Sequence, residues 1–231
     1  MNISVILNME GSWRLICGID EVARGPVVGP LIIVGYMIKE SDLDKLKATG
    51  VKDSKLLTHK QREKMVDKLK ELAEDYKVIV IQPKEIDEAV ESSDHMNLNW
   101  LEAKKQAEII NELDPDVAYI DCPSPNIRKY KDYLFNLINN DKIELIVEHK
   151  ADVKYPVVSA ASVIAKCIRE DHVKMIEEMT GQSIGSGYPS NPICQKFLKE
   201  NIDKYPDIFR KSWMTFKNHN AMKKQKKLDE F

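Results

Sequence analysis

The sequence predicts an α/β fold in which a mixed β-sheet is flanked by helices, with a C-terminal helical extension. Two apolar runs, residues 14–19 and 31–38, come early and are separated by a turn rich in glycine and proline, which indicates two consecutive strands. Farther along, short apolar runs alternate with segments of helical periodicity, an order typical of layered α/β domains. The length of 231 residues and the lack of an internal repeat fit one large domain, or one domain with a small appendage.

Local signals predict the individual elements. Thr58 and Gln61 form a capping box at the start of a helix, and Pro156 stands at the start of another. Asn99, with Glu102 three residues later, is predicted to cap a third. Expected strands cover residues 14–19, 31–38, 77–82, 117–120 and 143–148; expected helices cover residues 41–49, 58–73, a short segment from Pro83, 99–113, 127–138, 156–179, 191–205 and 206–217.

The composition is that of a globular protein, with 43% hydrophobic and 31% charged residues. No run of about 18 apolar residues occurs, so we expect no membrane span. The first residues lack the basic start and long apolar stretch of a signal peptide, and the four cysteines have no CxxC spacing. These features argue against structural zinc or a disulfide framework and favour a reducing, cytoplasmic location.

The net charge of −2 hides an asymmetry along the chain. Residues 196–231 contain ten Lys or Arg and five Asp or Glu, so this section is basic and the preceding body is acidic. A basic section beside an acidic body is compatible with a polyanionic partner. A solvated helix face followed by a charged tail explains the charges equally well.

Four acids follow apolar runs. Asp20 and Glu21 end the first expected strand, Asp121 ends VAYI, and Asp152 comes shortly after IELIVE. Since ligands of α/β sheets bind outside the carboxyl ends of strands, these acids are expected to gather at one edge. Close carboxylates need a cation or a proton between them, and hard oxygen ligands without imidazole or thiolate favour Mg²⁺ or Mn²⁺. Two such ions suit in-line attack on a phosphodiester.

A structural explanation stays open for each acid, because an Asp after a strand is commonly a turn residue or a helix cap. Successive residues of a regular strand also point to opposite faces. Asp20 and Glu21 can therefore share a site only if the strand bends or bulges, which Gly18 and Gly25 would permit.

Five short sequence blocks resemble the motifs of a known protein family. The chain contains GIDEVARGP, KDSK, YIDCPSPN, HKADVKYPVVSAASVIAKCIRED and GSGYPSNP in this order, and they fall within residues 15–215. In these blocks the sequence resembles the type 2 ribonuclease H family, particularly its archaeal form. The resemblance implies an RNase H-like fold, hydrolysis of the RNA strand of RNA–DNA hybrids, and incision 5′ of ribonucleotides embedded in duplex DNA. Products would carry 3′-hydroxyl and 5′-phosphate ends.

The resemblance also implies roles for individual residues. Asp20, Glu21, Asp121 and Asp152 correspond to the acids that bind two Mg²⁺ or Mn²⁺ ions and catalyse cleavage. Substrate contacts are implied for Ala23, Arg24, Gly25, Lys55, Lys166, Arg169 and the sugar-reading Tyr188. An exposed helix face stays open as an explanation of Lys166 and Arg169, and a tyrosine half-buried under a loop as one of Tyr188. The stretch SAASVIA (residues 159–165) is interpreted as a small-residue face for close packing, without chemistry.

Ala23 departs from the family pattern, which has Gly-Arg-Gly where this chain has Ala23-Arg24-Gly25. That triplet is thought to meet the ribose 2′-hydroxyl largely through main-chain atoms. A glycine there would permit a positive φ, which the methyl group of alanine disfavours. We expect Ala23 to affect the preference for single ribonucleotides more than catalysis.

The last seven residues, QKKLDEF, are similar to the peptide by which replication and repair proteins dock on the sliding clamp, although one aromatic is missing. Leu228 and Phe231 would enter an apolar groove and Gln225 would hydrogen-bond nearby. A chance match in a charged tail is the alternative.

These observations predict a catalytic domain over residues 1–190, a helical extension over 191–217, and a flexible basic tail over 218–231. A catalytically impaired hybrid-binding protein and a non-enzymatic clamp adaptor stay open as alternatives to the metal-dependent endoribonuclease.

Overall fold

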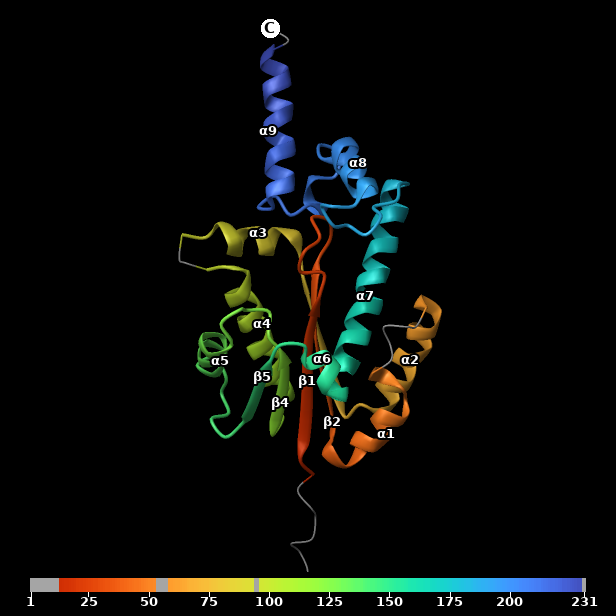
Figure 1. Cartoon of the computed structure of the whole chain (residues 1–231), viewed down its shortest axis with the longest axis vertical. Helices are drawn as coiled ribbons and strands as arrows, with labels where there is room; N and C mark the ends of the chain where they lie inside the picture. The colour runs from red at the N-terminus through yellow and green to blue at the C-terminus, as the bar shows by residue number, and fades with distance from the viewer. Residues whose placement is uncertain (1–12, 53–57, 94–95, 230–231) are drawn as a thin grey trace, which may run out of the picture.

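A five-stranded mixed sheet forms the centre of the computed structural model, which describes residues 13–52, 58–93 and 96–229, with side chains up to residue 221 (Figure 1). The strand order is β3-β2-β1-β4-β5, and β1 pairs antiparallel with β2 but parallel with β4. The mixed sheet predicted from the sequence is therefore confirmed. Its strands are β1 (Leu15–Val22), β2 (Leu31–Lys39), β3 (Asp75–Ile81), β4 (Val117–Asp121) and β5 (Glu144–Glu148).

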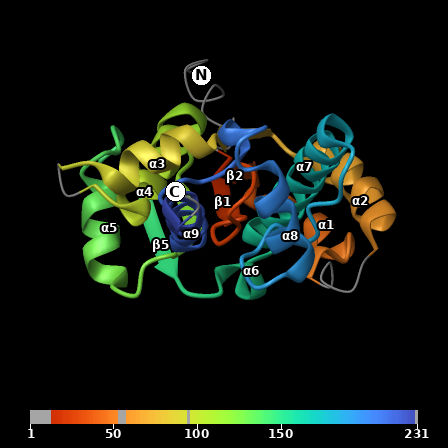
Figure 2. The same cartoon turned by 90° about the horizontal axis from the view of Figure 1, so that it is seen from above.

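Helices cover both faces of this sheet (Figure 2). Helices α1, α2 and α7 lie on one side, and α4 and α5 lie on the other. The helical elements are η2 (Glu40–Asp42), α1 (Leu43–Ala48), α2 (His59–Leu72), α3 (Pro83–Glu91), α4 (Leu98–Leu113), α5 (Ile127–Phe135), α6 (Ala151–Lys154), α7 (Pro156–Thr180), α8 (Pro192–Asn201), η4 (Pro206–Ile208) and α9 (Met214–Asp229).

The side chains of β1 alternate between the two faces of the sheet and so belong to two layers of the core. Cys17 and Ile19 belong to the layer beneath α4 and α5, whereas Ile16 belongs to the layer beneath α7. Helix α7 lies very close to β1, because a Cβ atom built on Gly18 would be only 2.2 Å from the carbonyl carbon of Val157. Ala160, Ala161 and Ala165 of the small-residue stretch are fully buried in the layer between α7 and the sheet, in agreement with the packing role expected from the sequence.

A third apolar cluster joins the C-terminal segments to the rest of the molecule. Val27 and Val28, which follow β1, pack with Phe197, Phe209 and Phe216. The segment after β1 is therefore held from the C-terminal side.

Several predicted helix boundaries are wrong, including the ends of α5 and α8, which stop at Phe135 and Asn201, before the expected residues 138 and 205. Asn97, not Asn99, caps α4, since its side chain accepts from the N–H of Trp100. The helix expected over residues 206–217 is interrupted, because Phe209 forms an antiparallel bridge with Val28 and Arg210 bonds to Val27. The backbone is instead helical from Met214 to Asp229, across residues expected in the tail. Lys, Gln, Ala and Met in this stretch have good helix propensity.

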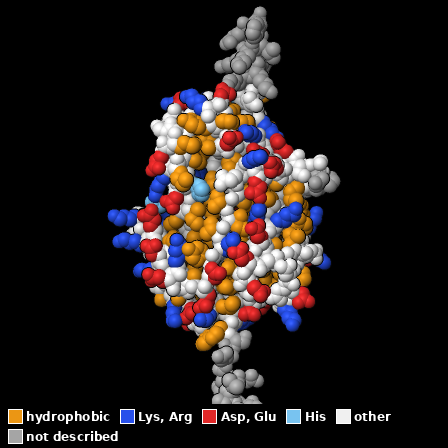
Figure 3. Space-filling model, turned by 180° about the vertical axis from the view of Figure 1, so that it is seen from behind, with side chains coloured by type: hydrophobic (Ala, Val, Ile, Leu, Met, Phe, Trp, Pro, Cys, Tyr) orange, Lys and Arg blue, Asp and Glu red, His pale blue; other side chains and the backbone are white. Residues whose placement is uncertain are grey.

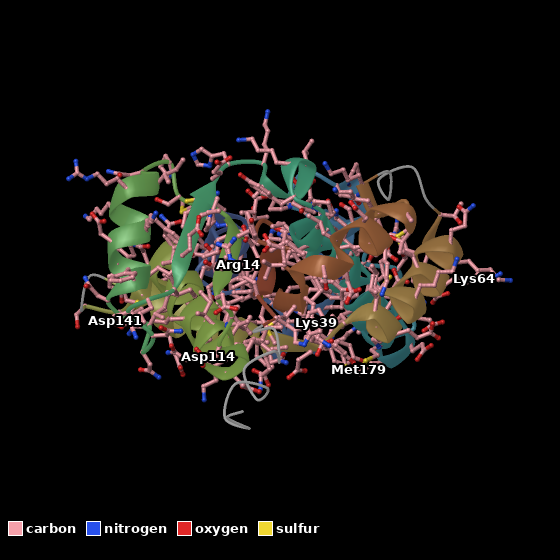
Figure 4. All side chains as sticks on the ribbon, turned by 90° about the horizontal axis from the view of Figure 1, so that it is seen from below. Arg14, Lys39, Lys64, Asp114, Asp141 and Met179 are labelled. Atoms are coloured by element: carbon pink, nitrogen blue, oxygen red, sulfur yellow. The ribbon has the colours of Figure 1, made fainter. Side chains whose placement is uncertain are left out.

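The surface mixes charges of both signs. On the face shown in Figure 3, acidic and basic side chains are interspersed with apolar ones. At the end opposite α9, Arg14 and Lys39 lie near the middle of the view in Figure 4, and Arg14 forms ion pairs with Glu40 and Glu144. Among the described residues, no helix combines the length and the apolar character that crossing a membrane requires.

Candidate active site

Three carboxylates meet at one edge of the sheet. Asp20 lies near the end of β1, Asp121 is the last residue of its parallel neighbour β4, and Asp152 lies in α6, just after β5. One ligand oxygen from each lies within 4.8 Å of those of the others. The sequence-based expectation that these acids gather at strand ends is thus met for three of the four.

The turn after β5 builds this edge. Lys150 adopts a left-handed conformation with φ of +58°, which begins α6 and brings Asp152 back toward the sheet. The N–H groups of Lys150 and Ala151 donate hydrogen bonds to the carboxylate of Asp121, the latter at 3.3 Å. The same turn therefore holds the carboxylate of Asp121 and positions Asp152 near it.

Glu21 lies on the opposite face of the sheet. The antiparallel register with β2 is unbroken from Leu15 to Val22, so the bend or bulge that the sequence required for a shared site is absent from β1. Glu21 faces Glu102 of α4, and its Oε2 atom is buried without a hydrogen-bond partner. Its role as a metal ligand stays a prediction.

The electrostatics of the three-carboxylate cluster favour a bound cation. Burial, with Asp121 and Asp152 nearby, raises the pKa of Asp20 to about 7. Burial and the neighbouring Asp152 also raise the pKa of Asp121. Oxygen donors that repel one another in this way fit a hard divalent cation such as Mg²⁺ or Mn²⁺, which would relieve the repulsion.

A short polar chain supports Asp20 from α7. The hydroxyl of Ser162 hydrogen-bonds to Asp20, and Nζ of Lys166 donates to Oγ of Ser162 at 2.8 Å. Both contacts favour the ionised form of Asp20. The stretch at 159–165 was expected to have no chemistry, and Ser162 corrects that expectation; the sequence gives no signal that separates it from the other small residues there.

The segment after β1 has an unusual backbone. Ala23 has a φ of +68° and is buried, although the sequence analysis expected its methyl group to disfavour this conformation. An L-residue in this region costs roughly 1–2 kcal/mol. The surrounding contacts therefore impose a conformation that glycine would adopt without strain.

The side chain of Arg24 is anchored to α4. Its Nε lies 3.0 and 3.2 Å from the two carboxylate oxygens of Glu102, and Nη2 donates to Oδ1 of Asn99. Glu102 is fully buried, and its burial raises its pKa to about 7, while Arg24 acts in the opposite direction. Asn99 and Glu102, which the sequence assigned to a helix cap, thus fix Arg24 instead.

The main chain of this segment keeps two donors open. Among the hydrogen bonds recorded for the described residues, none uses the N–H of Arg24 or of Gly25. Gly25 also permits a close approach, because a Cβ atom there would lie 2.9 Å from Cε1 of Tyr188. Tyr188 itself is about half exposed, with 45% of its surface accessible.

A groove of about 420 Å³ runs beside this segment. Ala23, Tyr188, Lys166 and Arg169 are among the residues that line it. Arg169 is buried, with Nη1 unpaired and Nη2 only 2.8 Å from where a Cβ of Gly187 would lie, so it does not belong to an exposed helix face. Lys166 and Arg169 place two cations in the lining of the groove, which suits it to phosphate oxygens.

Three expectations cannot be compared with the structure. Lys55 lies outside the described residues, as does Phe231. The backbone of Gln225 and Leu228 is described as part of α9, but their side chains are not. The clamp-binding peptide therefore stays a prediction.

One functional candidate was missed by the sequence analysis. Arg210 is fully buried beneath the segment after β1, and three backbone carbonyl oxygens accept from its guanidinium. A lone arginine in a basic section carries no signal of such a position. Its contacts arise only from the folded arrangement.

Comparison with known proteins agrees with this geometry. Residues 17–216 match the family model described as Ribonuclease HII. A curated Ribonuclease HII of Methanococcus maripaludis strain C7 is 43% identical over 216 residues, covering 90% of this chain and 88% of that protein.

Two solved structures are also similar. The ribonuclease H2 of Pyrococcus horikoshii OT3 has a TM-score of 0.82 and 38% identity, over 90% of this chain and 98% of that one. An RNase HII of Archaeoglobus fulgidus, solved as a complex with PCNA, has a TM-score of 0.78 and 35% identity, over 88% and 96% of the two chains.

Proposed function

The chain belongs to the ribonuclease HII family, and on this premise we propose that, besides cleaving the RNA strand of RNA–DNA hybrids, the enzyme incises duplex DNA 5′ of a single embedded ribonucleotide. The observation that carries the proposal is the convergence of Asp20, Asp121 and Asp152, together with two open N–H donors at Arg24 and Gly25 in the segment that follows Asp20. The acids supply a site for cations, and the donors supply a means to recognise one ribose hydroxyl.

The carboxylates of Asp20, Asp121 and Asp152 would hold divalent cations. Burial, Glu102, Asp20 and Asp121 raise the pKa of Glu21, and because two of these acids belong to the cluster, Glu21 is proposed to contribute a further ligand despite the regular pairing of β1. When bound, two such cations would lower the pKa of an attacking water and stabilise the leaving 3′ oxygen. Mg²⁺ and Mn²⁺ both suit this oxygen donor set. The products would be 3′-hydroxyl and 5′-phosphate ends.

The remaining residues of the groove would bind and orient the nucleic acid. The N–H groups of Arg24 and Gly25 would donate to the ribose 2′-hydroxyl, and the ring of Tyr188 would stack on the sugar or base. Lys166 and Arg169 would contact phosphates, which position the duplex without reading its sequence. Lys55 is expected to add a further phosphate contact.

One assay tests the proposal directly. A DNA duplex with a single ribonucleotide is incubated with Mg²⁺ or Mn²⁺ and the cut site is mapped, with an all-DNA duplex as the control. We expect one cut on the 5′ side of the ribonucleotide and none in the control. Cleavage of a hybrid without any cut in the single-ribonucleotide duplex would reject the narrower activity.

We also propose that the C-terminal peptide docks on a sliding clamp. Helix α9 projects from the body of the molecule, and its last five residues, 225–229, are the first five of QKKLDEF (Figure 1). The similar archaeal enzyme solved with PCNA supports such a partner. Deleting residues 225–231 should abolish clamp binding in a pull-down and leave cleavage without the clamp unchanged; retained binding would exclude the peptide.

We propose a cytoplasmic location for the enzyme. Four free, buried cysteines are in keeping with a reducing, cytoplasmic location.

A further inference from the structure

Arg210 holds the carbonyl groups of the segment that follows β1. Its Nη2 donates to the carbonyl oxygen of Ala23 at 2.7 Å, its Nη1 to that of Arg24 at 2.9 Å, and its Nε to that of Gly29 at 3.0 Å. The side chain is fully buried, and every hydrogen bond recorded for its guanidinium ends on a main-chain oxygen. Burying a cation without a carboxylate at hydrogen-bond distance is costly, so these three contacts are what retains it there.

Trp213 extends this set of contacts by one residue. Its indole Nε1 donates to the carbonyl oxygen of Gly25 at 3.2 Å, and the guanidinium carbon of Arg210 lies 5.0 Å from the centre of its ring. Three successive carbonyl groups, those of residues 23, 24 and 25, are thus directed at the C-terminal segment.

The direction of these carbonyl groups determines the direction of the N–H groups. In a planar trans peptide, the C=O of one residue and the N–H of the next point in opposite directions. The N–H groups of Arg24 and Gly25 must therefore point away from Arg210, and both lack a recorded partner among the described residues. The next residue, Pro26, has no N–H, so the segment presents two donors and no third.

The segment that carries Arg210 is itself fixed from α3. Asp87 accepts from the N–H of Lys211 at 2.8 Å and from the N–H and hydroxyl of Ser212 at 2.9 and 2.6 Å. The N–H of Arg210 also donates to the carbonyl of Val27. The backbone that carries the Arg210 side chain is therefore held in place, as is required of a residue that positions other groups.

We infer that Arg210 is a positioning residue that sets the preference for a ribonucleotide, by holding the carbonyl groups of residues 23–24 inward so that the N–H groups of Arg24 and Gly25 face the ribose. This inference rests on the proposed function. The planar fork of arginine reaches three acceptors at once, whereas lysine offers a single ammonium that cannot span them. A positive charge at position 210 is therefore not sufficient to hold these carbonyl groups.

Binding measurements with cleavage blocked test this inference. In an Asp121→Asn background, affinities are measured for a DNA duplex with one ribonucleotide and for the same duplex without it. The variants are Arg210→Lys, which keeps the charge, and Lys211→Ala as the control. Lys211 is the exposed neighbour, and within the described part of the chain its ammonium has one ion pair, with Asp207 at 3.6 Å. Melting temperatures of all variants report whether the fold is kept.

We expect Arg210→Lys to reduce the ratio of the two affinities by about tenfold, the effect of losing one or two hydrogen bonds from the N–H groups of Arg24 and Gly25 to the ribose, while affinity for all-DNA duplex stays the same. Lys211→Ala should leave the ratio unchanged. Equal losses for both duplexes, or an unchanged ratio in Arg210→Lys, would overturn the inference and leave the proposed function intact. If the parent protein bound the two duplexes equally well, both the inference about Arg210 and the proposed function would be overturned.

Discussion

Asp20 and Glu21 are adjacent in the sequence, but their side chains leave opposite faces of β1. Asp20 meets Ser162 of α7, whereas Glu21 meets Glu102 of α4. The strand keeps its regular pairing with β2 through both residues, so the alternation of side chains is preserved. The two side chains therefore lie in different layers of the molecule, and single substitutions can test the role proposed for each.

Removing one charge from the cluster should abolish cleavage without unfolding the protein. Asp20→Asn and Asp121→Asn are each expected to lower Mg²⁺-dependent cleavage by roughly a thousandfold or more, because cation binding and its charge stabilisation are lost. Without metal, neither variant should melt below the parent protein, since each removes a repulsive contact. Cleavage rates and melting curves in EDTA measure both effects.

Asp114→Asn is the matched control. Asp114 lies outside the cluster, adopts a left-handed conformation that Asn also tolerates, and accepts a hydrogen bond from Asn140 that Asn can still accept. Its cleavage rate should equal that of the parent protein. Substantial activity in Asp20→Asn, or an equal loss in Asp114→Asn, would count against the assigned roles.

The stability of the metal-free protein should fall as the pH rises from about 4 to about 7. Burial raises the pKa of Asp20 from 3.8 to about 7, so in this window the folded state keeps a proton that the unfolded state has lost. The free energy of unfolding in EDTA should decrease across the window, and Asp20→Asn should flatten the decrease.

Metal binding should reverse this effect. Since cations bind the ionised carboxylates, Mg²⁺ should raise the melting temperature more at about pH 8 than at about pH 5. An equal rise at both pH values would show that cations bind elsewhere.

Ala23→Gly should relieve backbone strain. Ala23 has a φ of +68°, so glycine is expected to raise the free energy of unfolding by roughly 1 kcal/mol at most. Because the backbone already has this conformation, incision at single ribonucleotides should improve only modestly, by about threefold or less, and hybrid cleavage should stay nearly unchanged. Equal or worse incision by the glycine variant would show that the methyl group does not hinder substrate.

Tyr188 should contribute through its ring. The ring packs on Gly25 and is half exposed, and no hydrogen bond of its hydroxyl is recorded among the described residues. Tyr188→Ala should lower kcat/KM on the single-ribonucleotide duplex by about tenfold to a hundredfold, the usual effect of losing a stacking platform. Tyr188→Phe should stay close to the parent protein; a loss as large as that of alanine would assign the role to the hydroxyl group.

Local patterns were sufficient for most of the fold. The capping box at Thr58, the helix that begins at Pro156 and the five apolar runs all became the expected elements. Where a prediction was wrong, a competing local signal or a distant contact was responsible. Asn97, two residues earlier, caps α4 in place of Asn99, whose side chain accepts from Arg24, 75 residues away in the sequence.

The sequence by itself indicated which acids would gather at one edge of the sheet, and three of the four do, because acids at the ends of apolar runs are a feature of local order along the chain. It also determined the order of the strands in the chain, which limits where those ends meet. Only the tertiary structure decided that Asp20 and Glu21 serve different faces, that Glu102 receives Arg24, and that Arg210 holds Ala23 in a left-handed conformation. These outcomes depend on packing between segments separated by as many as 187 residues, and no local periodicity encodes such a contact.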